Sequence, residues 1–182
     1  GSLPSVSLPD SVTEVGERAF GSCVRLQQIT LPDSVTVLGI GAFQGCRALT
    51  EVGLPQRLET VPVSLFEGCS SLPTVELPDS VTEIGQSAFK NCHTLKSIHL
   101  SQNLRTIGED AFIFCYDLVS LEVPEGVTSI GEGAFSYCEA LASVVLPGSI
   151  TTMGEGIFYQ SELLETAGPM GSGCDIQFGW TD

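Results

Sequence analysis

The chain repeats a 23-residue pattern seven times without a gap, and no other feature limits its fold as strongly. The full repeats begin at Leu8, Leu31, Leu54, Leu77, Leu100, Val123 and Leu146. A fixed period of this length predicts a solenoid, because one repeat cannot bury its apolar face until a neighbour stacks on it. We expect residues 1–168 to form one solenoid domain, with a partial coil over residues 1–7 and seven full repeats over residues 8–168.

The repeat register is lost after Gly168, where glycine becomes frequent. Residues 169–182 are therefore predicted to form an irregular C-terminal coil, either a cap or the start of a truncated insertion. This tail also contains the seventh cysteine, Cys174, which we expect to be accessible.

One repeat contains a strand, a turn, a second extended segment and a stretch with helical spacing. Residues 95–100 alternate between apolar and polar, so Ile98 would point inward while Ser97 and His99 point outward, as in a short strand. The second extended segment ends at Gly85, whose position predicts either a positive φ or a crowded corner. The next apolar residues lie three and four apart, which predicts a short helix with one buried face: Ala88, Phe89, Cys92 and Leu95. The predicted fold class is therefore an α/β solenoid.

Two columns of identical residues are predicted to fill its interior. Phenylalanine occupies one position in every full repeat and would form an aromatic spine: Phe20, Phe43, Phe66, Phe89, Phe112, Phe135 and Phe158. Cysteine occupies another position in six repeats: Cys23, Cys46, Cys69, Cys92, Cys115 and Cys138. A disulfide needs Cα atoms within about 7 Å and matching Cβ directions, which a repeated inward position does not supply. We predict free, buried thiols that pack as small apolar groups.

The chain is strongly acidic, with 7 Lys and Arg against 22 Asp and Glu and a formal net charge of −15. This balance argues against nucleic acid and anionic membranes as partners, because neither attracts an acidic surface. The negative charge has two explanations. It keeps an elongated module in solution, or it attracts a cationic partner. No apolar run approaches the length of a membrane span, and no signal-peptide pattern opens the chain.

The pattern Leu-x-x-Ile/Val-x-Leu-Pro-x-x-Val-x-x-Ile-Gly-x-x-Ala-Phe-x-x-Cys, which covers residues 3–168, resembles the BspA-like or Treponema-type leucine-rich repeat. The resemblance implies a right-handed, gently curved stack whose strands line one face. It also implies an extracellular or cell-surface location and adhesion to host matrix glycoproteins. Local departures occur at Arg57, Leu58 and Pro62 in the third repeat, at Ser101 in the fifth and at Ser161 in the seventh.

The outward strand residues vary from repeat to repeat, whereas the inward ones do not, so we expect function on this face. The face is polar and shallow, which suits a protein or glycan better than an enclosed substrate. The predicted ligand-binding residues are Gln28, Thr30, Glu51, Thr74, Glu76, Lys96, Ser97, His99, Ser120 and Glu122. A solvated sheet face without a ligand is the alternative.

We therefore expect a non-enzymatic, monomeric binding module without a cofactor. A structural spacer or intracellular scaffold of the same fold is one alternative. Seven cysteines without a predicted disulfide favour the reducing compartment that a scaffold would occupy. A cysteine-dependent hydrolase built on Cys92 and His93 is a remote alternative. Adjacent residues on a turn point in different directions, whereas a dyad needs the base to reach the thiol.

A second candidate partner patch lies on the predicted helix side, where large residues replace small or polar ones: Ile113, Phe114, Tyr116, Tyr137 and Tyr159. Exposed aromatic patches mark interaction sites, although Ile176, Phe178 and Trp180 of the tail could fold over this one. Glu109, Glu132 and Glu155 form a further column that could attract calcium. We expect these carboxylates to face water near the helix N-termini instead, and we predict no metal site.

Overall fold

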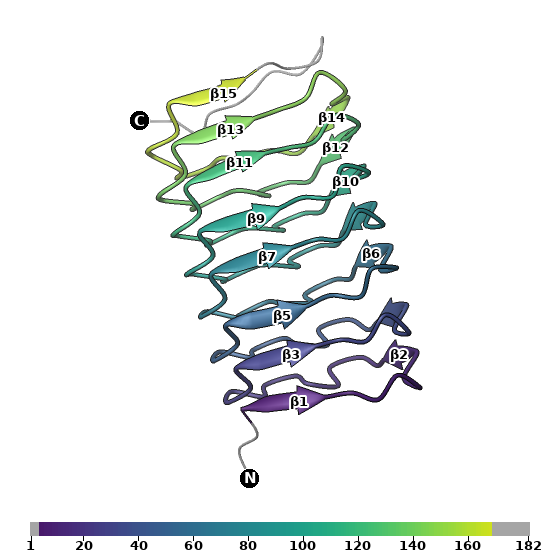
Figure 1. The fold of residues 1–182 in the computed structure, drawn as a ribbon. Coiled ribbons are helices and arrows are strands. Elements are labelled where there is room, and N and C mark those ends of the chain that lie inside the picture. The colour runs from purple at the N-terminus through teal and green to yellow at the C-terminus, as the bar shows by residue number, and fades with distance from the viewer. Residues whose placement is uncertain (1–3, 169–182) are drawn as a thin grey trace.

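The computed structural model describes residues 4–168 as a stack of 23-residue coils, each contributing two short strands (Figure 1). The longer strands form the first column: β1 (Ser5–Ser7), β3 (Gln28–Thr30), β5 (Glu51–Gly53), β7 (Thr74–Glu76), β9 (Ser97–His99), β11 (Ser120–Glu122), β13 (Ser143–Val145) and β15 (Thr166–Gly168). The shorter strands form the second column: β2 (Glu14–Val15), β4 (Val37–Leu38), β6 (Thr60–Val61), β8 (Glu83–Ile84), β10 (Thr106–Ile107), β12 (Ser129–Ile130) and β14 (Thr152–Met153). The predicted tail, with Cys174, lies outside the described residues.

Strands within a column pair in parallel, each residue facing its equivalent in the next coil. Ser97 faces Thr74 in this way, and Ile107 faces Ile130. In the first column the hydrogen-bonded sheets are β1-β3-β5, β7-β9 and β11-β13-β15, and in the second they are β2-β4 and β6-β8-β10-β12-β14. Each column is therefore one row of strands whose hydrogen bonding is interrupted at defined places.

Two prolines of the third repeat account for two of these interruptions. In other coils the residue equivalent to Pro73 donates its N–H to the coil before, as Lys96 does to Pro73 O at 2.8 Å. Pro73 has no N–H, so the bond to Thr50 O cannot form and the ladder stops between β5 and β7. Pro62 has the same effect between β4 and β6, because its equivalent Gly85 donates to Val61 O at 2.7 Å.

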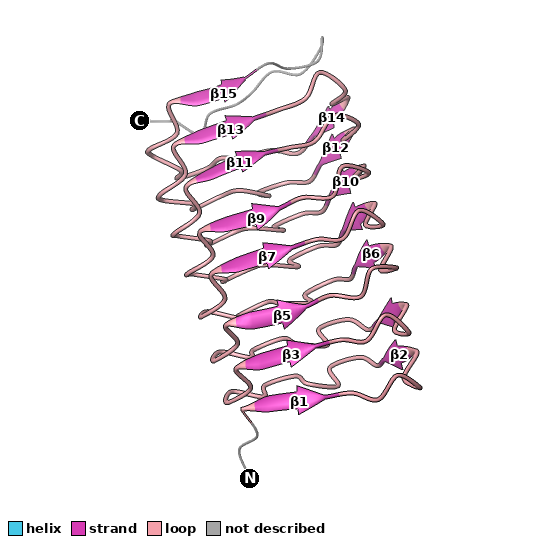
Figure 2. Cartoon of the chain, in the orientation of Figure 1, coloured by secondary structure: helices cyan, strands magenta, loops and turns pink. Residues whose placement is uncertain are grey.

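The predicted short helix is wrong: residues 4–168 contain none, and the segment is a series of tight turns (Figure 2). Alternate N–H groups in this segment bond to the next coil rather than within it. Ser87, Phe89 and Asn91 donate to Glu109, Ala111 and Ile113 oxygens at 2.8, 2.8 and 3.0 Å. The intervening donors bond to the carbonyl three residues earlier and close four-residue β-turns, so no N–H remains for an α-helical bond. The fold is a β-solenoid rather than an α/β one.

Two residues in each turn adopt a left-handed backbone, which also excludes a helix. Ser87 has φ 56° and Asn91 φ 61°, and the equivalent residues throughout the stack are alike. We call this third row of inter-coil bonds the turn ladder.

From Gly39 onward the corner glycines allow close packing, which confirms the crowded corner, one of the two predicted explanations, and rejects the positive φ. A Cβ added at Gly131 would lie 2.3 Å from Glu109 N, and one at Gly108 would lie 2.6 Å from Gln86 N. Neither glycine has a positive φ. Each glycine therefore lets its corner rest directly on the peptide of the preceding coil.

The interior confirms the predicted aromatic spine. The seven phenylalanine rings stack in one row with centroid separations of 5.1–5.7 Å. Phe43, Phe66, Phe89, Phe112 and Phe135 are completely buried. Each coil therefore closes the core of its neighbour, as a repeat architecture requires.

The predicted ladder of free thiols is correct for five of six repeat positions. Cys46, Cys69, Cys92, Cys115 and Cys138 are buried and free, whereas Cys23 is free but exposed. Each buried thiol donates to the carbonyl of the phenylalanine 26 residues earlier, as Cys92 Sγ does to Phe66 O at 3.2 Å. Cys23 lies in the first turn of the described residues, so no earlier turn covers its thiol. Ser161 replaces the cysteine of the last repeat and makes the same bond to Phe135 O at 2.8 Å.

Candidate binding surface

The first strand column presents an exposed polar face, which we call the strand face. All ten residues predicted to bind a ligand are exposed there, because odd and even strand positions alternate between core and solvent. Ile29 and Val75, between predicted residues, are only 2% exposed. The sequence therefore predicted correctly which side chains reach solvent, but exposure alone does not identify a site.

The strand face is interrupted between β9 and β11. No proline stands there. Instead, Val119 N–H reaches Lys96 O at 3.4 Å, whereas the equivalent bonds of Ala142 and Glu165 measure 2.9 and 3.0 Å. The ladder is stretched at this step rather than blocked, and strand pairing resumes only from β11 to β13.

A hollow of about 420 Å³ lies over this interruption and reaches Val145 at the end of β13. Four predicted residues line it, namely Ser97, His99, Ser120 and Glu122. The other predicted residues lie outside its lining: Lys96 next to β9, and Gln28, Thr30, Glu51, Thr74 and Glu76 on β3, β5 and β7. The predicted residues on β9 and β11 therefore line the hollow, whereas those on β3, β5 and β7 do not.

The loops that follow the strands complete the hollow, and the sequence analysis missed them. Gln102 and Glu125 contribute polar side chains, while Pro124 and Pro147 contribute apolar ones. One signal could have drawn attention to this region, because Ser101 replaces the usual proline.

Ser101 is fully buried, and its hydroxyl joins two loops. It donates to Asp79 O at 3.1 Å and accepts from Asn103 N–H at 3.1 Å. The hydroxyl thereby fixes the loop that carries Gln102, and the hollow has a defined wall on that side.

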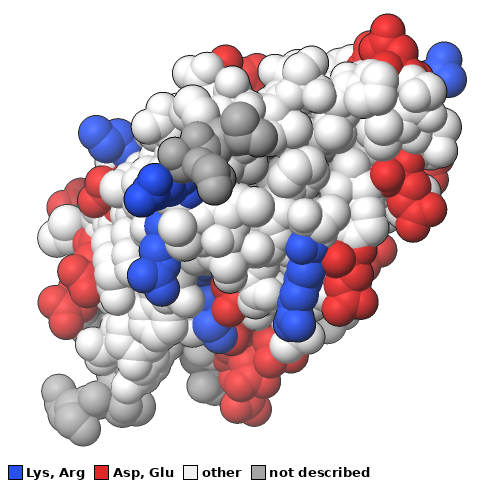
Figure 3. Space-filling model, turned by 90° about the horizontal axis from the view of Figure 1, so that it is seen from below, with Lys and Arg blue, Asp and Glu red and all other residues white. Residues whose placement is uncertain are grey.

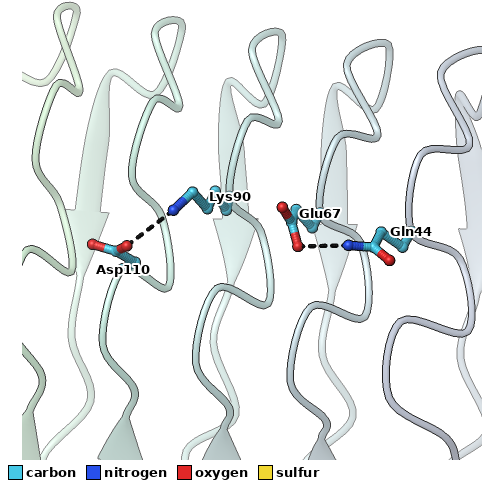
Figure 4. Close-up of polar contacts among 4 residues, drawn as sticks. All are labelled: Gln44, Glu67, Lys90 and Asp110. Carbon is cyan, nitrogen blue, oxygen red and sulfur yellow. Dashed lines mark hydrogen bonds and ion pairs between the residues drawn. The ribbon is translucent and has the colours of Figure 1, made fainter. Parts of the chain in front are cut away.

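Two polar contacts link side chains of adjacent coils above the turn ladder (Figure 4). Gln44 Nε2 donates to Glu67 Oε2 at 2.9 Å, and Lys90 Nζ contacts Asp110 Oδ2 at 3.1 Å. Both side chains of the ion pair are partly exposed, so the pair contributes little to stability. The first contact joins the second and third repeats and the other joins the fourth and fifth, so both lie in the middle of the stack.

Further along the turns, the structure brings the predicted aromatic residues together. The Phe114 ring lies 6.2 Å from Tyr116 and 4.9 Å from Tyr137, and Tyr137 meets Tyr159 edge-on at 5.5 Å. His93, which we did not assign to this group, stacks on Tyr116 at 4.9 Å. The five rings form a continuous aromatic patch, half-buried except for Tyr159, which is 40% exposed. Ile113 is half-buried in the same turn as Phe114.

The buried thiols are unsuited to nucleophilic chemistry. Burial raises the pKa of the Cys92 thiol well above its usual value, and the thiol donates to Phe66 O. His93 is stacked on Tyr116 instead of accepting from that thiol. Because the thiolate is the reactive form, the geometry and the raised pKa both argue against a hydrolase dyad at Cys92 and His93.

Between residues 4 and 168, no three His, Cys, Asp or Glu side chains gather closely enough to hold a metal ion. The same part of the chain has no helical segment with the length and apolar character of a membrane span.

Comparison with known proteins supports the architecture. The model of the BspA type leucine rich repeat region, in 6 copies, matches residues 1–92 and 61–171. The crystal structure of the leucine-rich repeat protein of Treponema pallidum is similar, with 34% identity and a TM-score of 0.86 over 90% of this chain and 79% of that one. No curated protein matches the chain.

Two larger structures share the fold. A leucine rich cell surface protein of Faecalibacterium prausnitzii has 31% identity and a TM-score of 0.67, covering 91% of this chain and 53% of its own. A leucine-rich repeat protein of Bacteroides ovatus, at 24% identity and a TM-score of 0.63, covers 84% of this chain and 48% of its own. The chain thus spans about half the length of these two proteins.

Proposed function

Because the chain belongs to the BspA-type leucine-rich repeat family, we propose that it is a non-enzymatic module that binds a protein or glycan through its strand face. The observation that carries the proposal is the hollow over β9, β11 and β13. Its volume of about 420 Å³ is sufficient for one sugar unit or one large side chain, and falls within the range of known ligand sites. A host matrix glycoprotein offers both kinds of group.

The lining of the hollow supports a polar ligand. Glu122 and Glu125 supply acceptors, Ser120 and Gln102 can donate or accept, and His99 adds a ring that can do either. These groups suit sugar hydroxyls or peptide amides better than an apolar ligand. The two carboxylates also disfavour an anionic glycan.

We further propose that the protein acts at the cell surface. The support is the family itself and the similar protein of Faecalibacterium prausnitzii, which is named as a cell surface protein. The binding surface is open and runs along the stack, so a large extended partner can contact several coils at once.

The test is binding of the purified chain to an array of matrix glycoproteins and free glycans. A triple variant, with Lys96, His99 and Glu122 changed to Ala, removes exposed side chains in and beside the hollow. A matched control changes Glu14, Glu83 and Thr106 to Ala, because these residues point outward from the second column instead.

We expect the unmodified chain and the control to bind the same array members, and the triple variant to bind roughly tenfold more weakly or less. Circular dichroism should give the same folded spectrum for all three proteins. Equal binding by the triple variant would place the site elsewhere. Binding to no array member would favour a structural spacer.

A further inference from the structure

The aromatic patch occupies backbone positions that disfavour large side chains. Phe114 and Tyr137 have φ values of 63° and 56°, in the left-handed region. Other coils place Ser22, Gly45, Gly68, Asn91 and Gln160 at this position, and glycine and asparagine adopt the conformation more easily than the rest. Stacking between the rings offsets part of the strain, but the backbone alone would not select aromatic residues here. Every turn of the stack has this conformation, so it is the choice of aromatic residues, and not the backbone, that distinguishes these two coils.

Four of the five rings of the patch, all except His93, lie in the part of the chain that has no Lys or Arg. Every Lys and Arg lies at or before Arg105, whereas residues 106–168 include ten Asp and Glu. By contrast, the opposite, N-terminal end of the stack carries side chains of both signs (Figure 3). The charge of the stack is therefore uneven along its length.

Three exposed carboxylates adjoin the patch, carried by Asp117, Glu139 and Glu162. Asp117 follows Tyr116 directly. Ala140 N–H donates to Tyr116 O at 3.0 Å, which fixes Glu139 in the coil next to Tyr116, and Glu162 occupies the same position one coil further. These carboxylates thus form an acidic border along one side of the rings.

We propose that the aromatic patch and its acidic border bind a basic segment of a partner protein, rich in lysine or arginine. A cation is attracted to the face of an aromatic ring, and arginine also stacks on it. The adjacent carboxylates pair with the same cationic groups, and their attraction steers the approach of the partner. Charge complementarity therefore selects a basic peptide over an acidic or neutral one.

The aromatic patch lies on the turn side and not on the strand face, so binding there is independent of the glycan or protein proposed for the strand face. The test uses the whole chain and a fluorescein-labelled peptide of alternating lysine and glycine, with binding followed by fluorescence anisotropy. A serine and glycine peptide of equal length serves as the neutral probe. Three variants are compared: Phe114→Asn with Tyr137→Asn, Glu139→Gln with Glu162→Gln, and Glu122→Ala on the strand face.

Asparagine is chosen because Asn91 already occupies the equivalent position at φ 61°, so the double variant should melt at or near the temperature of the unmodified chain. We expect the lysine peptide to bind at low salt and the neutral peptide not to bind. The Asn double variant should weaken binding roughly tenfold, and the Gln double variant severalfold. Glu122→Ala should leave it within about twofold, and raising the salt should weaken it.

Several results would overturn the inference. They are lack of binding at low salt, equal binding of the neutral peptide, or unchanged binding by the Asn double variant with its fold intact. If residues 169–182 covered the patch, the result would be the first of these, lack of binding at low salt. An equal loss in Glu122→Ala would also overturn it, by indicating attraction to the acidic surface in general.

Discussion

The turn ladder and the first strand column follow the same stack of coils but differ in continuity. Every coil from Arg18 onward donates three N–H groups to the next one in the turn ladder, without interruption up to Tyr137. The first strand column, in contrast, lacks strand pairing between β5 and β7 and again between β9 and β11. The turn side also carries the stacked phenylalanine spine directly beside its ladder.

This difference shows which part of the molecule can change. Because the turn ladder and the spine connect all coils, the strand column can lose hydrogen bonds at two steps while the stack continues. A hollow can then form at one of these steps without dividing the solenoid. We therefore expect changes on the turn side to be costly and changes on the strand side to be mild.

The largest effect is expected from Phe89→Ala, at the centre of the spine. The Phe89 side chain is fully buried between Phe66 and Phe112, so its loss should reduce the free energy of unfolding by about 3–5 kcal/mol. Thr74→Ala, on the exposed strand face, is the control and should cost less than about 0.5 kcal/mol. Urea unfolding of both variants measures the difference, and comparable costs would refute the proposed division between the two sides.

The second effect tests the contact between corners and the coil below. Gly131→Ala should destabilise the protein by about 1–3 kcal/mol, because the new Cβ would lie 2.3 Å from Glu109 N, which cannot move independently. Gly148→Ala is the matched control, since a Cβ there meets nothing within 4 Å. Thermal melting of the two variants should separate them clearly. Equal melting temperatures would mean that the corner can relax.

The third effect concerns the thiols that lie between the spine and the turns. Burial raises the pKa of Cys138 from 9.0 to about 12, so the folded state favours the neutral thiol. The stabilisation is complete below pH 9 and is lost as the pH rises towards 12, because the unfolded chain then releases the proton first. At pH 10 the loss should be about 1.4 kcal/mol per such thiol.

Cys138→Ser isolates this contribution, because Ser161 already occupies the equivalent place in the next coil with its hydroxyl bonded to Phe135 O. Between pH 7 and pH 10 the variant should lose about 1.4 kcal/mol less of its free energy of unfolding than the unmodified chain. The comparison is made by urea unfolding at both pH values. Parallel pH profiles would show that the Cys138 thiol ionises as readily in the folded protein as in the unfolded one.

The regular parts of this fold were predictable from the sequence, because the relevant signals are local and are repeated. Alternation around Ile98 located a strand and its outward residues, and the recurring phenylalanine located the spine. The helix was predicted wrongly, since a spacing of three and four also fits consecutive tight turns. The decisive fact is that Phe89 N–H donates to Ala111 O, and a single repeat does not reveal a bond to the next coil.

The candidate site was predictable only in part, for a related reason. Exposure of His99 and Glu122 follows from strand alternation, but the hollow between them depends on how far β9 lies from β11. That separation is a property of two coils together, and Gln102 and Glu125 join the site only through their loops. The proline interruptions were accessible to reasoning, because a residue without N–H cannot continue a ladder. The interruption between β9 and β11, where no proline stands, was not accessible in this way.

The smallest effect is expected from repairing one interruption on the strand side. Pro73→Lys, which copies Lys96 of the next coil, supplies an N–H that can donate to Thr50 O. A hydrogen bond gained is worth about 0.5–1.5 kcal/mol, whereas losing proline costs about 0.4–1 kcal/mol through the entropy of the unfolded chain. Stability should therefore change by less than about 1 kcal/mol, in either direction.

Hydrogen exchange gives the clearer measurement, since the new amide should be protected as strongly as that of Lys96, which is bonded at 2.8 Å. Rapid exchange at position 73 would mean that β5 and β7 are held apart by more than the missing donor. The interruptions would then be features of the packing, and the tolerance of the strand side would have to be explained by its side chains rather than by its prolines.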